Sequence, residues 1–303
     1  MKIVSYLGGV PSPHKNLHKT EVLRRFIDGV NKHRDEGIAH TGRNLLACNV
    51  GVIQGWVHDN SPKTPHLMLR RQVSQNTQNK HTIIVDSNLF NYNLGKLYHK
   101  HYSRYSIDGV FPTTGNYFKD TVDPNRWKQI SQDLQLSLKD WRTNGEHILL
   151  ACQRNGGWSM DTYAVTDWIN NTVSELRKYT DRPIVVRGHP GDKNAIKYLS
   201  QKGVVWQLSR KEKITDDFNN AWATITYNSS PGVASAIEGV PVFVTDPNAR
   251  VSQAFEVANT NLADIENPKT FERQNWIESL SMSHWKFEEL SDGTAWKHMR
   301  NYL

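Results

Sequence analysis

The sequence predicts an α/β protein made of two Rossmann-like lobes with a cleft between them. Short apolar runs alternate with longer helical patterns, which is typical of β-α-β units and mostly parallel sheets. The alternation breaks at 142–146 and then restarts. The length of 303 residues also suits two domains of ordinary size. We therefore expect a first lobe over 1–143, a second over 144–280, and a C-terminal helical segment over 281–303, for which we consider a return to the first lobe.

The first lobe has three expected strands and three expected helices. Thr20 is placed to cap the first helix, while Asp123 and Pro124 suit the cap and first turn of the last one. The strands are expected at 2–9, 49–57 and 81–90, and the helices at 20–33, 65–78 and 123–141.

The second lobe repeats the pattern with five apolar runs. The expected strands are 147–152, 183–188, 203–208, 221–227 and 240–245, and 161–179 is the clearest helix between them. Ligands of such folds bind at the carboxyl ends of the strands, so we searched the residues that follow each strand for functional groups.

Composition excludes several classes of protein. The 37% hydrophobic content, with ten Trp and eleven Tyr, is sufficient to build cores. No window approaches the roughly 18 apolar residues that a membrane span needs. The first residues read as a strand rather than a signal peptide. Cys48 and Cys152 are the only cysteines, so a disulfide framework is excluded and a cytoplasmic location is expected.

Positive charge is confined to the first half of the chain. Residues 1–143 contain 20 Lys and Arg against 11 Asp and Glu, a net charge of +9, whereas residues 144–303 contain 17 against 19, a net charge of −2. Nine of the thirteen His also lie in the first half. This asymmetry favours a polyanionic partner for the first lobe; a merely soluble basic surface is the alternative.

Several nucleotide and metal motifs are absent from the sequence. It contains no GxxxxGK[ST] and no GxGxxG after a strand, which argues against a P-loop and a dinucleotide fingerprint. It also lacks Asp-x-Asp, the usual carboxylate pair for a divalent metal beside a sugar nucleotide. His99 and His101 share a face if they lie in a strand, but no third ligand is near them in sequence. We therefore expect no metal site.

Three strands of the second lobe end in polar loops suited to phosphate. The stretch 223–247 places Asn228, Ser229 and Ser230 between a strand and a short helix of small residues, whose amino end favours an anion. The other two loops carry Gln153 and Arg154, and Arg187 and His189. Arginine holds phosphate bidentately, and histidine donates to it. A plain capped helix is the alternative for the first loop.

The set QRNGGW, VVRGHPGD and ITYNSSPGVASAIEGVPVFV resembles the donor lobe of GT-B glycosyltransferases of the capsular-polysaccharide and Kdo-transferase type, over about 145–250. The resemblance implies that His189 and the turn of Asn228, Ser229 and Ser230 bind the diphosphate of a nucleotide-sugar, with a UDP-sugar as the expected donor. It implies supporting contacts from Gln153, Arg154 and Arg187.

The resemblance also implies a ribose contact for Glu238, at the end of the short helix. The chain departs from the family here, because the second Glu of the usual E-x7-E pair is replaced by Asp246. The alternative to the ribose contact is therefore a purely structural role for Glu238 and Asp246.

A compact enzyme with a basic acceptor lobe resembles the bacteriophage DNA glycosyltransferases, which add glucose or arabinose to 5-hydroxymethylcytosine. The leading interpretation is transfer to this base in double-stranded DNA, in the host cytoplasm if the chain is phage-encoded. The expected acceptor contacts are His14, Lys15, Arg70, Arg71 and Arg104. The alternatives are a transferase of capsule or lipopolysaccharide synthesis, a nucleotide-sugar epimerase, and a non-catalytic DNA-binding protein.

A hydroxyl acceptor needs a base, and the first lobe offers few carboxylates. Asp86, at the end of an apolar strand, is the first choice, and Asp108 is the second. A turn-capping role is the alternative for Asp86. With either base we expect a metal-independent reaction. If DNA is the target, aromatic side chains in loops of the first lobe could fill the stack after base flipping, but packing in the lobe's own core is the stronger interpretation of each one. These side chains are Phe90, Tyr92, Tyr117 and Phe118.

Overall fold

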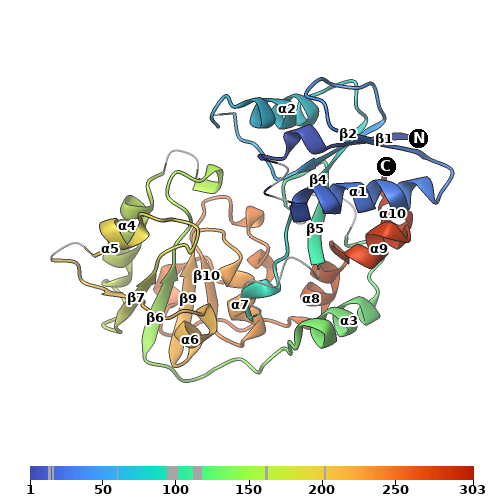
Figure 1. Cartoon of the computed structure of the whole chain (residues 1–303). Helices are drawn as coiled ribbons and strands as arrows, with labels where there is room; N and C mark the ends of the chain where they lie inside the picture. Colours follow the sequence, from blue (N-terminus) through green and yellow to red (C-terminus); the bar gives the residue numbers. More distant parts are fainter. Residues whose placement is uncertain are drawn as a thin grey trace. The chain divides into compact units, whose positions relative to one another are not determined.

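The computed structural model describes residues 1–12, 15, 17–59, 61–93, 102–111, 118–160, 163–200 and 203–303. The chain forms two compact units, whose elements are labelled in Figure 1. Unit 1 comprises 1–88, 96–126 and 278–303, and unit 2 comprises 89–95 and 127–277. The predictions His14, His99, His101 and Tyr117 lie outside the described residues.

Apart from residues 89–95, which belong to unit 2, the chain passes between the units within two helices rather than at 142–146. Helix α3 (Pro124–Leu134) contains the change after residue 126, and α8 (Gln274–Ser281) contains the change after residue 277. Arg126 belongs to unit 1 because its buried guanidinium pairs with Glu289 and lies 3.9 Å from the ring centre of Trp285. The C-terminal segment is thus part of unit 1.

Unit 1 contains a six-stranded sheet in the order β11-β5-β4-β3-β1-β2. The strands are β1 (Lys2–Tyr6), β2 (Glu36–His40), β3 (Val50–Gln54), β4 (His81–Ser87), β5 (Tyr102–Ile107) and β11 (His284–Lys286). Neighbours among β1 to β4 pair in parallel, while β5 runs antiparallel to both β4 and β11. The pattern of apolar runs missed three strands. These are β2, which is half exposed, β5, in which Ser and Arg interrupt the apolar residues, and β11, which is only three residues long.

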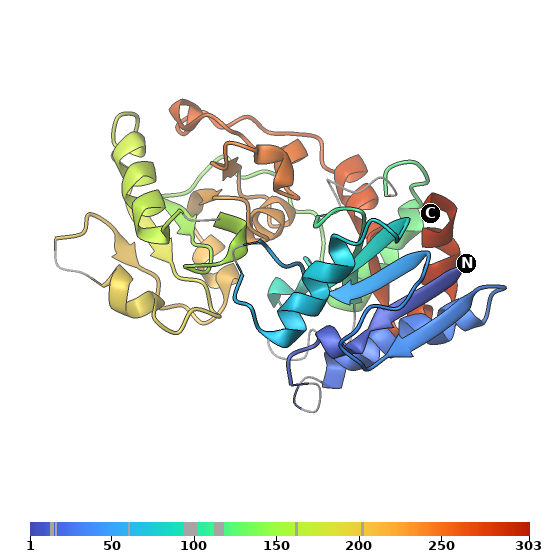
Figure 2. The ribbon, with the colours of Figure 1, turned by 90° about the horizontal axis from the view of Figure 1, so that it is seen from above.

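Helices cover both faces of this sheet. Helix α2 (Pro65–Ser74) packs on one face, and α1 (Leu17–Asn31) packs on the other with α9 (Phe287–Ser291) and α10 (Thr294–Met299). Helix α1 begins at Leu17, so Thr20 lies inside it and is not its cap. Figures 1 and 2 both show the two chain ends close together in this unit.

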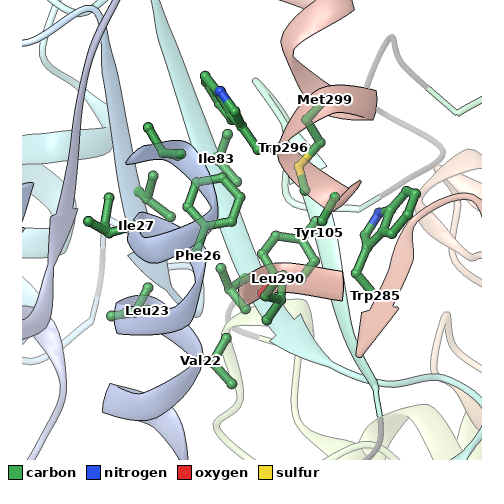
Figure 3. Close-up of a cluster of buried hydrophobic side chains, with 14 of the residues drawn as sticks. Val22, Leu23, Phe26, Ile27, Ile83, Tyr105, Trp285, Leu290, Trp296 and Met299 are labelled. Atoms are coloured by element: carbon green, nitrogen blue, oxygen red, sulfur yellow. The ribbon is translucent and has the colours of Figure 1, made fainter. Parts of the chain in front are cut away.

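Aromatic side chains from distant parts of the sequence form the centre of unit 1 (Figure 3). Phe26 of α1 stacks on Tyr105 of β5 and meets Trp296 of α10 edge to face, each with ring centroids 5.8 Å apart. All three are fully buried. Burial on this scale is the main favourable contribution to folding, so the C-terminal helices are part of the core.

Unit 2 contains a parallel five-stranded sheet in the order β10-β9-β6-β7-β8. Its strands are β6 (His147–Ala151), β7 (Ile184–Arg187), β8 (Gln207–Leu208), β9 (Ala221–Thr226) and β10 (Val242–Val244). Helices α4 (Val165–Leu176) and α5 (Ala195–Leu199) pack on one face, and α6 (Ile214–Phe218) and α7 (Pro231–Ile237) on the other. Five strands appear close to their predicted positions, which confirms the α/β assignment.

The described 3-10 helices are short connecting turns. They span Leu7–Gly9, Asn91–Asn93, Trp158–Met160, Ala249–Val251, Phe255–Val257, Leu262–Asp264 and Arg300–Tyr302.

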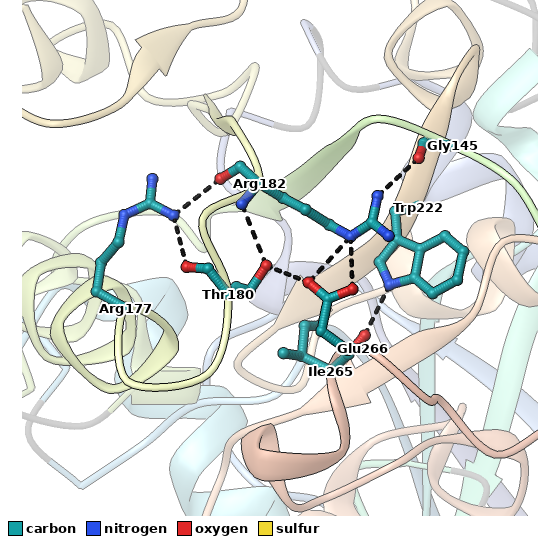
Figure 4. Close-up of polar contacts among 7 residues, drawn as sticks. All are labelled: Gly145, Arg177, Thr180, Arg182, Trp222, Ile265 and Glu266. Atoms are coloured by element: carbon teal, nitrogen blue, oxygen red, sulfur yellow. Dashed lines mark hydrogen bonds and ion pairs between the residues drawn. The ribbon is translucent and has the colours of Figure 1, made fainter.

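Polar side chains close the amino edge of the unit 2 sheet (Figure 4). Arg182 pairs with Glu266 at 3.0 Å, donates to the carbonyl of Gly145 at 2.8 Å, and lies 4.1 Å from the ring centre of Trp222. The Trp222 Nε1 donates to the carbonyl of Ile265 at 2.7 Å. The groups at this edge therefore bind one another, and the carboxyl edge is the place to examine for ligand contacts.

Candidate functional site

Amide side chains join two loops at the carboxyl edge of the unit 2 sheet. The strand order reverses between β6 and β9, and ligands of open α/β sheets bind at such a switch point. Gln153, after β6, donates to Asn228, after β9, and to the hydroxyl of Ser159 at 3.0 Å. Asn228 donates to Asp246 Oδ2, after β10, at 2.6 Å. Because both amides are buried and engaged within the protein, they fix the loops of this edge.

His189 is held in one tautomer by its own loop. The backbone N–H of Gly191 donates to His189 Nδ1 at 2.9 Å, so Nδ1 is an acceptor and a neutral ring carries its proton on Nε2. Burial lowers the pKa of His189, and the charge of Arg154 lowers it further, against the opposing effect of Asp192. At neutral pH His189 is therefore a neutral ring with an Nε2–H donor, for which the described residues provide no acceptor.

Asp192 fixes the loop that contains His189. It accepts hydrogen bonds from the Tyr198 hydroxyl at 2.8 Å, the Asn194 backbone N–H at 3.0 Å and the Asn155 backbone N–H at 3.2 Å. Burial favours the neutral form of Asp192, but these hydrogen bonds outweigh burial and lower its pKa. The side chain thus joins the loop after β6 to the loop after β7, and it keeps Arg154 and His189 close enough to influence each other.

The turn before α7 provides fewer backbone donors than the sequence predicts. The N–H groups of Gly232 and Val233 donate to the carbonyls of Ser229 and Ser230, at 3.0 and 2.9 Å. Ser230 is exposed and makes no side-chain cap. The buried Ser229 Oγ, in contrast, has no hydrogen-bond partner in the part of the chain that the structure describes. A buried hydroxyl without a partner costs free energy, so Ser229 is the hydroxyl of this turn that a ligand oxygen would satisfy.

Arg187 has a structural role in place of the predicted phosphate contact. Its guanidinium pairs with the buried Asp217 and donates to the carbonyls of Lys211 at 3.1 Å and Glu212 at 2.9 Å. Asp217 also accepts from the Ser209 hydroxyl at 2.6 Å. Arg187 therefore closes the loop between β8 and α6. The sequence places it correctly at a strand end but does not show which way the side chain turns.

Glu238 also differs from its expected ribose role. It lies at the far end of α7 from Ser230, about 12 Å away at 1.5 Å per residue. Its carboxylate is buried, pairs with Lys139 and accepts from the Tyr92 hydroxyl at 3.1 Å. Burial raises the pKa of Tyr92, and the Glu238 charge raises it further. The carboxylate at the sheet's carboxyl edge is instead Asp246.

Asp246 borders a pocket of about 460 Å³ that follows β10. Arg250 and Phe255 also line it, and the Arg250 guanidinium lies 5.9 Å from the Phe255 ring centre. A pocket of this size with an aromatic wall suits a small organic ligand. In the sequence, Asp246 is predicted only as an imperfect partner of Glu238. Its position two residues after β10 is the signal that identifies it.

Asp86 lies at the carboxyl edge of the unit 1 sheet, as its position after an apolar run predicts. Its Oδ2 accepts from Arg104 at 2.8 Å and its Oδ1 from the Ser87 backbone N–H at 2.7 Å. The second contact agrees with the turn-capping role, while the carboxylate stays 27% exposed and reachable by a ligand. Arg104 is only 4% exposed. It therefore positions Asp86 and does not contribute to an exposed basic surface.

Asp108 is not at this edge. It follows β5, which runs antiparallel to β4, so it lies beside the start of β4 and about 13 Å along that strand from Asp86. Its carboxylate accepts from the Thr82 backbone N–H at 2.8 Å and contacts His81 at 2.5 Å. Asp108 has a φ of 53°, and these contacts stabilise that left-handed turn. The structure thus removes the second choice of base.

Arg70 and Arg71, adjacent on α2, are engaged within unit 1. Arg71 donates to the carbonyls of His58, Asp59 and Ser61 at 3.0 to 3.1 Å. Arg70 is 7% exposed and donates from Nε to the carbonyl of Gly9 at 2.6 Å.

Lys15 is exposed and is the described member of the predicted acceptor set that remains available to a large partner. The aromatic candidates Phe90 and Phe118 are buried, which confirms their alternative role as core residues.

Two general searches of the described residues gave no site. None of the helices within the described ranges is both long and apolar enough to cross a membrane. Nor do three or more His, Cys, Asp or Glu side chains in those ranges gather closely enough to hold a metal ion.

No protein-family model matches the chain, and no curated protein matches its sequence. Two solved structures from Thermosulfurimonas dismutans are similar in fold. The first is the KpsC beta Kdo 2,7 transferase, with 12% identity over 97% of this chain and 99% of that chain and a TM-score of 0.55. The second is the KpsC beta Kdo 2,4 transferase, with 14% identity over 94% and 91% and a TM-score of 0.57. Likeness at this level of identity establishes the architecture: the chain has the two-domain α/β fold of GT-B glycosyltransferases.

Proposed function

We propose that this chain is a glycosyltransferase that takes a sugar from a nucleotide-sugar, with a UDP-sugar as the first donor to test. The observation that supports the proposal is the set of donors at the switch point of unit 2. His189 offers an Nε2–H, and Ser229 offers a buried hydroxyl without a partner among the described residues. Arg154 is exposed, and its charge acts on His189. These are groups that bind a diphosphate, and they lie where GT-B-like sheets bind ligands.

The nucleoside would occupy the pocket after β10. Asp246 is the carboxylate at its border, and we assign to it the ribose contact that the resemblance gave to Glu238. Asn228 orients Asp246 through the hydrogen bond of 2.6 Å between them. Gln153 and Asn228 then act as positioning residues that hold the loops after β6, β9 and β10 in place.

The proposed reaction is a displacement at the anomeric carbon of the donor sugar. The acceptor hydroxyl oxygen forms the new bond to that carbon, Asp86 receives the hydroxyl proton, and the nucleoside diphosphate leaves with the electron pair of the broken bond. His189 and Arg154 stabilise the charge on the leaving diphosphate. These protein groups supply the required charge stabilisation, and we propose that the reaction needs no metal or cofactor besides the nucleotide-sugar.

Two acceptors remain candidates, and different observations favour them. The whole net charge of +7 belongs to unit 1, which has 20 Lys and Arg against 13 Asp and Glu, while unit 2 has 17 of each. This favours 5-hydroxymethylcytosine in double-stranded DNA.

Arg70, Arg71 and Arg104, however, are engaged inside unit 1 instead of facing a duplex. This favours a compact acceptor, as in synthesis of a capsule or lipopolysaccharide, and we regard it as the better supported of the two.

A transfer assay tests the proposal. The purified chain is incubated with UDP-, GDP- and CMP-sugars and with one of three acceptors: duplex DNA containing 5-hydroxymethylcytosine, the same duplex containing cytosine, and a set of anionic oligosaccharides. Mass spectrometry of the acceptor identifies any added sugar. Addition of one sugar mass to any acceptor supports a glycosyltransferase and identifies the acceptor class.

The alternatives predict different products. An epimerase converts the nucleotide-sugar without an acceptor, which separation of the donor isomers detects. A non-catalytic DNA-binding protein binds duplex DNA and leaves every donor intact. Either result would contradict the proposed function.

A further inference from the structure

Arg70 spans the switch point of the unit 1 sheet. The strand order reverses between β1 and β3, and the Arg70 side chain lies between the backbones that follow these two strands. Its Nε donates to the carbonyl of Gly9 at 2.6 Å, and its Nη1 lies 3.0 Å from where a Cβ on Gly55 would be. Gly55 has a φ of 79°, so glycine both permits this turn and leaves room for the guanidinium.

The guanidinium uses few of its donors within the protein. Arg70 is 7% exposed, and the Nε contact with Gly9 is its one hydrogen bond to the part of the chain that the structure describes. Burial lowers its pKa to about 10, with the charge of Asp86 opposing the shift. An arginine has five N–H donors in a fork that fits carboxylate and phosphate oxygens. The Nη groups are therefore available to an anion at the switch point.

Lys19 of α1 adds a second cation at the same place. Its ammonium has no hydrogen-bond or ion-pair partner in the described ranges, although it is partly buried. Burial lowers the pKa of Lys19, the charge of Arg70 lowers it further, and Asp86 opposes the change. The charges of Lys19 and Arg70 thus repel each other.

The nearby negative charge does not balance these cations. Asp86 acts on both Lys19 and Arg70, but its carboxylate is already paired with Arg104 at 2.8 Å. Among the described residues, Lys19, Arg70 and Arg104 thus all interact with the carboxylate of Asp86. Partly buried charges that lack partners are costly, and a bound anion of one or two charges would remove the imbalance.

We propose that Arg70 and Lys19 bind a compact anionic group of the acceptor, a sugar carboxylate or sugar phosphate, and so place the acceptor's hydroxyl beside Asp86. The proposal rests on the proposed glycosyltransferase function and specifies the acceptor as an anionic sugar. A duplex backbone is disfavoured because Arg70 is almost completely enclosed, whereas backbone contacts are made by exposed cations.

Calorimetric titration of the complete chain without any nucleotide-sugar tests the anion site. The probes are glucuronate, glucose 6-phosphate, inorganic phosphate and, as the neutral counterpart, glucose, all at constant ionic strength. We expect saturable binding of anionic probes and none of glucose. Comparison of glucuronate with the phosphates distinguishes the two anion chemistries.

Matched variants locate the binding. Arg70→Gln and Lys19→Gln are each expected to weaken anion binding about tenfold or more, because each removes a charge-assisted contact. Lys32→Gln is the control: it removes an exposed charge just beyond the other end of the same helix, about 20 Å along it from Lys19, and should leave affinity unchanged. If Arg70→Gln fails to fold, Arg70→Lys takes its place in the titration. It keeps the positive charge but loses the forked N–H donors of the guanidinium.

Thermal unfolding gives a second readout. Relief of the repulsion from Arg70 should raise the Tm of ligand-free Lys19→Gln above that of the wild type, while the increase in Tm caused by phosphate becomes smaller. Three results would overturn the proposal: a Tm of ligand-free Lys19→Gln below that of the wild type, anion binding no tighter than glucose binding, or an equal loss of anion affinity in Lys32→Gln. So would duplex DNA binding that depends on Arg70.

The two proposals fail separately. Anion binding that depends on Arg70 and Lys19, without any sugar transfer, would support the anion site and contradict the transferase. Sugar transfer to a neutral acceptor at a rate that Arg70→Gln does not change would support the transferase and contradict the anion site.

Discussion

The carboxyl edges of the two sheets share one topology and differ in charge. Each edge has a switch point, between β1 and β3 in unit 1 and between β6 and β9 in unit 2. A charged guanidinium, Arg70, spans the first, whereas the neutral amides of Gln153 and Asn228 join across the second. The same β-α-β architecture thus produces one edge with a buried cation at its switch point and one edge with neutral amides there and Arg154 as an exposed cation, because loop residues rather than strands set the chemistry.

This difference suggests a division of roles. In the proposed reaction, a neutral His189 ring would bind the leaving group without adding a permanent charge, which would suit release of a product diphosphate. The cations around Asp86 suit an anionic substrate, and Arg104 holds the Asp86 carboxylate in place. The following predictions test this contrast, beginning with the largest effect.

Asp86→Asn should lower the transfer rate about 10³-fold, because the acceptor hydroxyl loses its base. Nucleotide affinity should be unchanged, since the nucleotide site is assigned to unit 2. Steady-state kinetics and nucleotide titration measure the two quantities. Asp108→Asn is the matched control at the other edge of the same sheet, and its rate should stay near that of the wild type. An active Asp86→Asn enzyme would remove Asp86 from the mechanism.

His189→Ala should lower kcat about 100-fold, through loss of one donor to the leaving diphosphate. Gly191→Ala should have a smaller effect of the same kind, since its Cβ would lie 3.1 Å from the His189 ring and displace it. Because burial lowers the pKa of His189, the rate should not decrease as pH falls through 6.5, the ordinary value for histidine. A decrease centred at 6.5 would show that the ring titrates as an exposed histidine.

Asp35→Asn should destabilise unit 1 by about 2 kcal/mol at neutral pH. Burial alone would raise the Asp35 pKa, but contacts with Arg300, the Met1 ammonium and Trp296 outweigh it and lower the pKa from 3.8 to about 2. A lowered pKa in the folded state means that this stability is present above pH 3.8 and is lost as pH falls through 2. Urea unfolding at pH 7 and pH 3 measures it.

The comparison for Asp35 is the more exposed ion pair between Glu266 and Arg182 in unit 2. Glu266→Gln should cost less than about 1 kcal/mol, because its carboxylate is 38% exposed and screened by water. An equal loss in the two variants would mean that burial does not set the strength of these contacts.

Glu238→Gln should have the smallest effect on function. Nucleotide affinity should stay within about twofold of the wild type, since the carboxylate contacts Lys139 and Tyr92 at the far end of α7. Asp246→Asn should weaken nucleotide binding about tenfold, as expected for a hydrogen bond to a charged group. If the two variants exchange these effects, the ribose contact belongs to Glu238.

Sequence periodicity predicts most strands but not where side chains turn. The apolar runs that became β6, β7 and β9 predict the sheet of unit 2, and the polar residues after them lie at its carboxyl edge. Arg187 follows the same rule and yet turns to Asp217, because this buried carboxylate of helix α6 is the stronger partner. Arg70 appears in sequence as a surface cation of α2, and its burial depends on two distant glycines, Gly9 and Gly55.

The most direct test of the two edges is hydrogen exchange of the complete chain, measured by mass spectrometry with and without ligand. The ligands are UDP, GDP or CMP in one series and glucuronate or inorganic phosphate in the other. We predict that a nucleotide protects 152–157, 188–192 and 227–232, and that an anion protects the segments around Lys19, Arg70 and Asp86. Protection of the Arg70 edge by nucleotides, with none at the His189 loop, would contradict the division of roles between the two sheets.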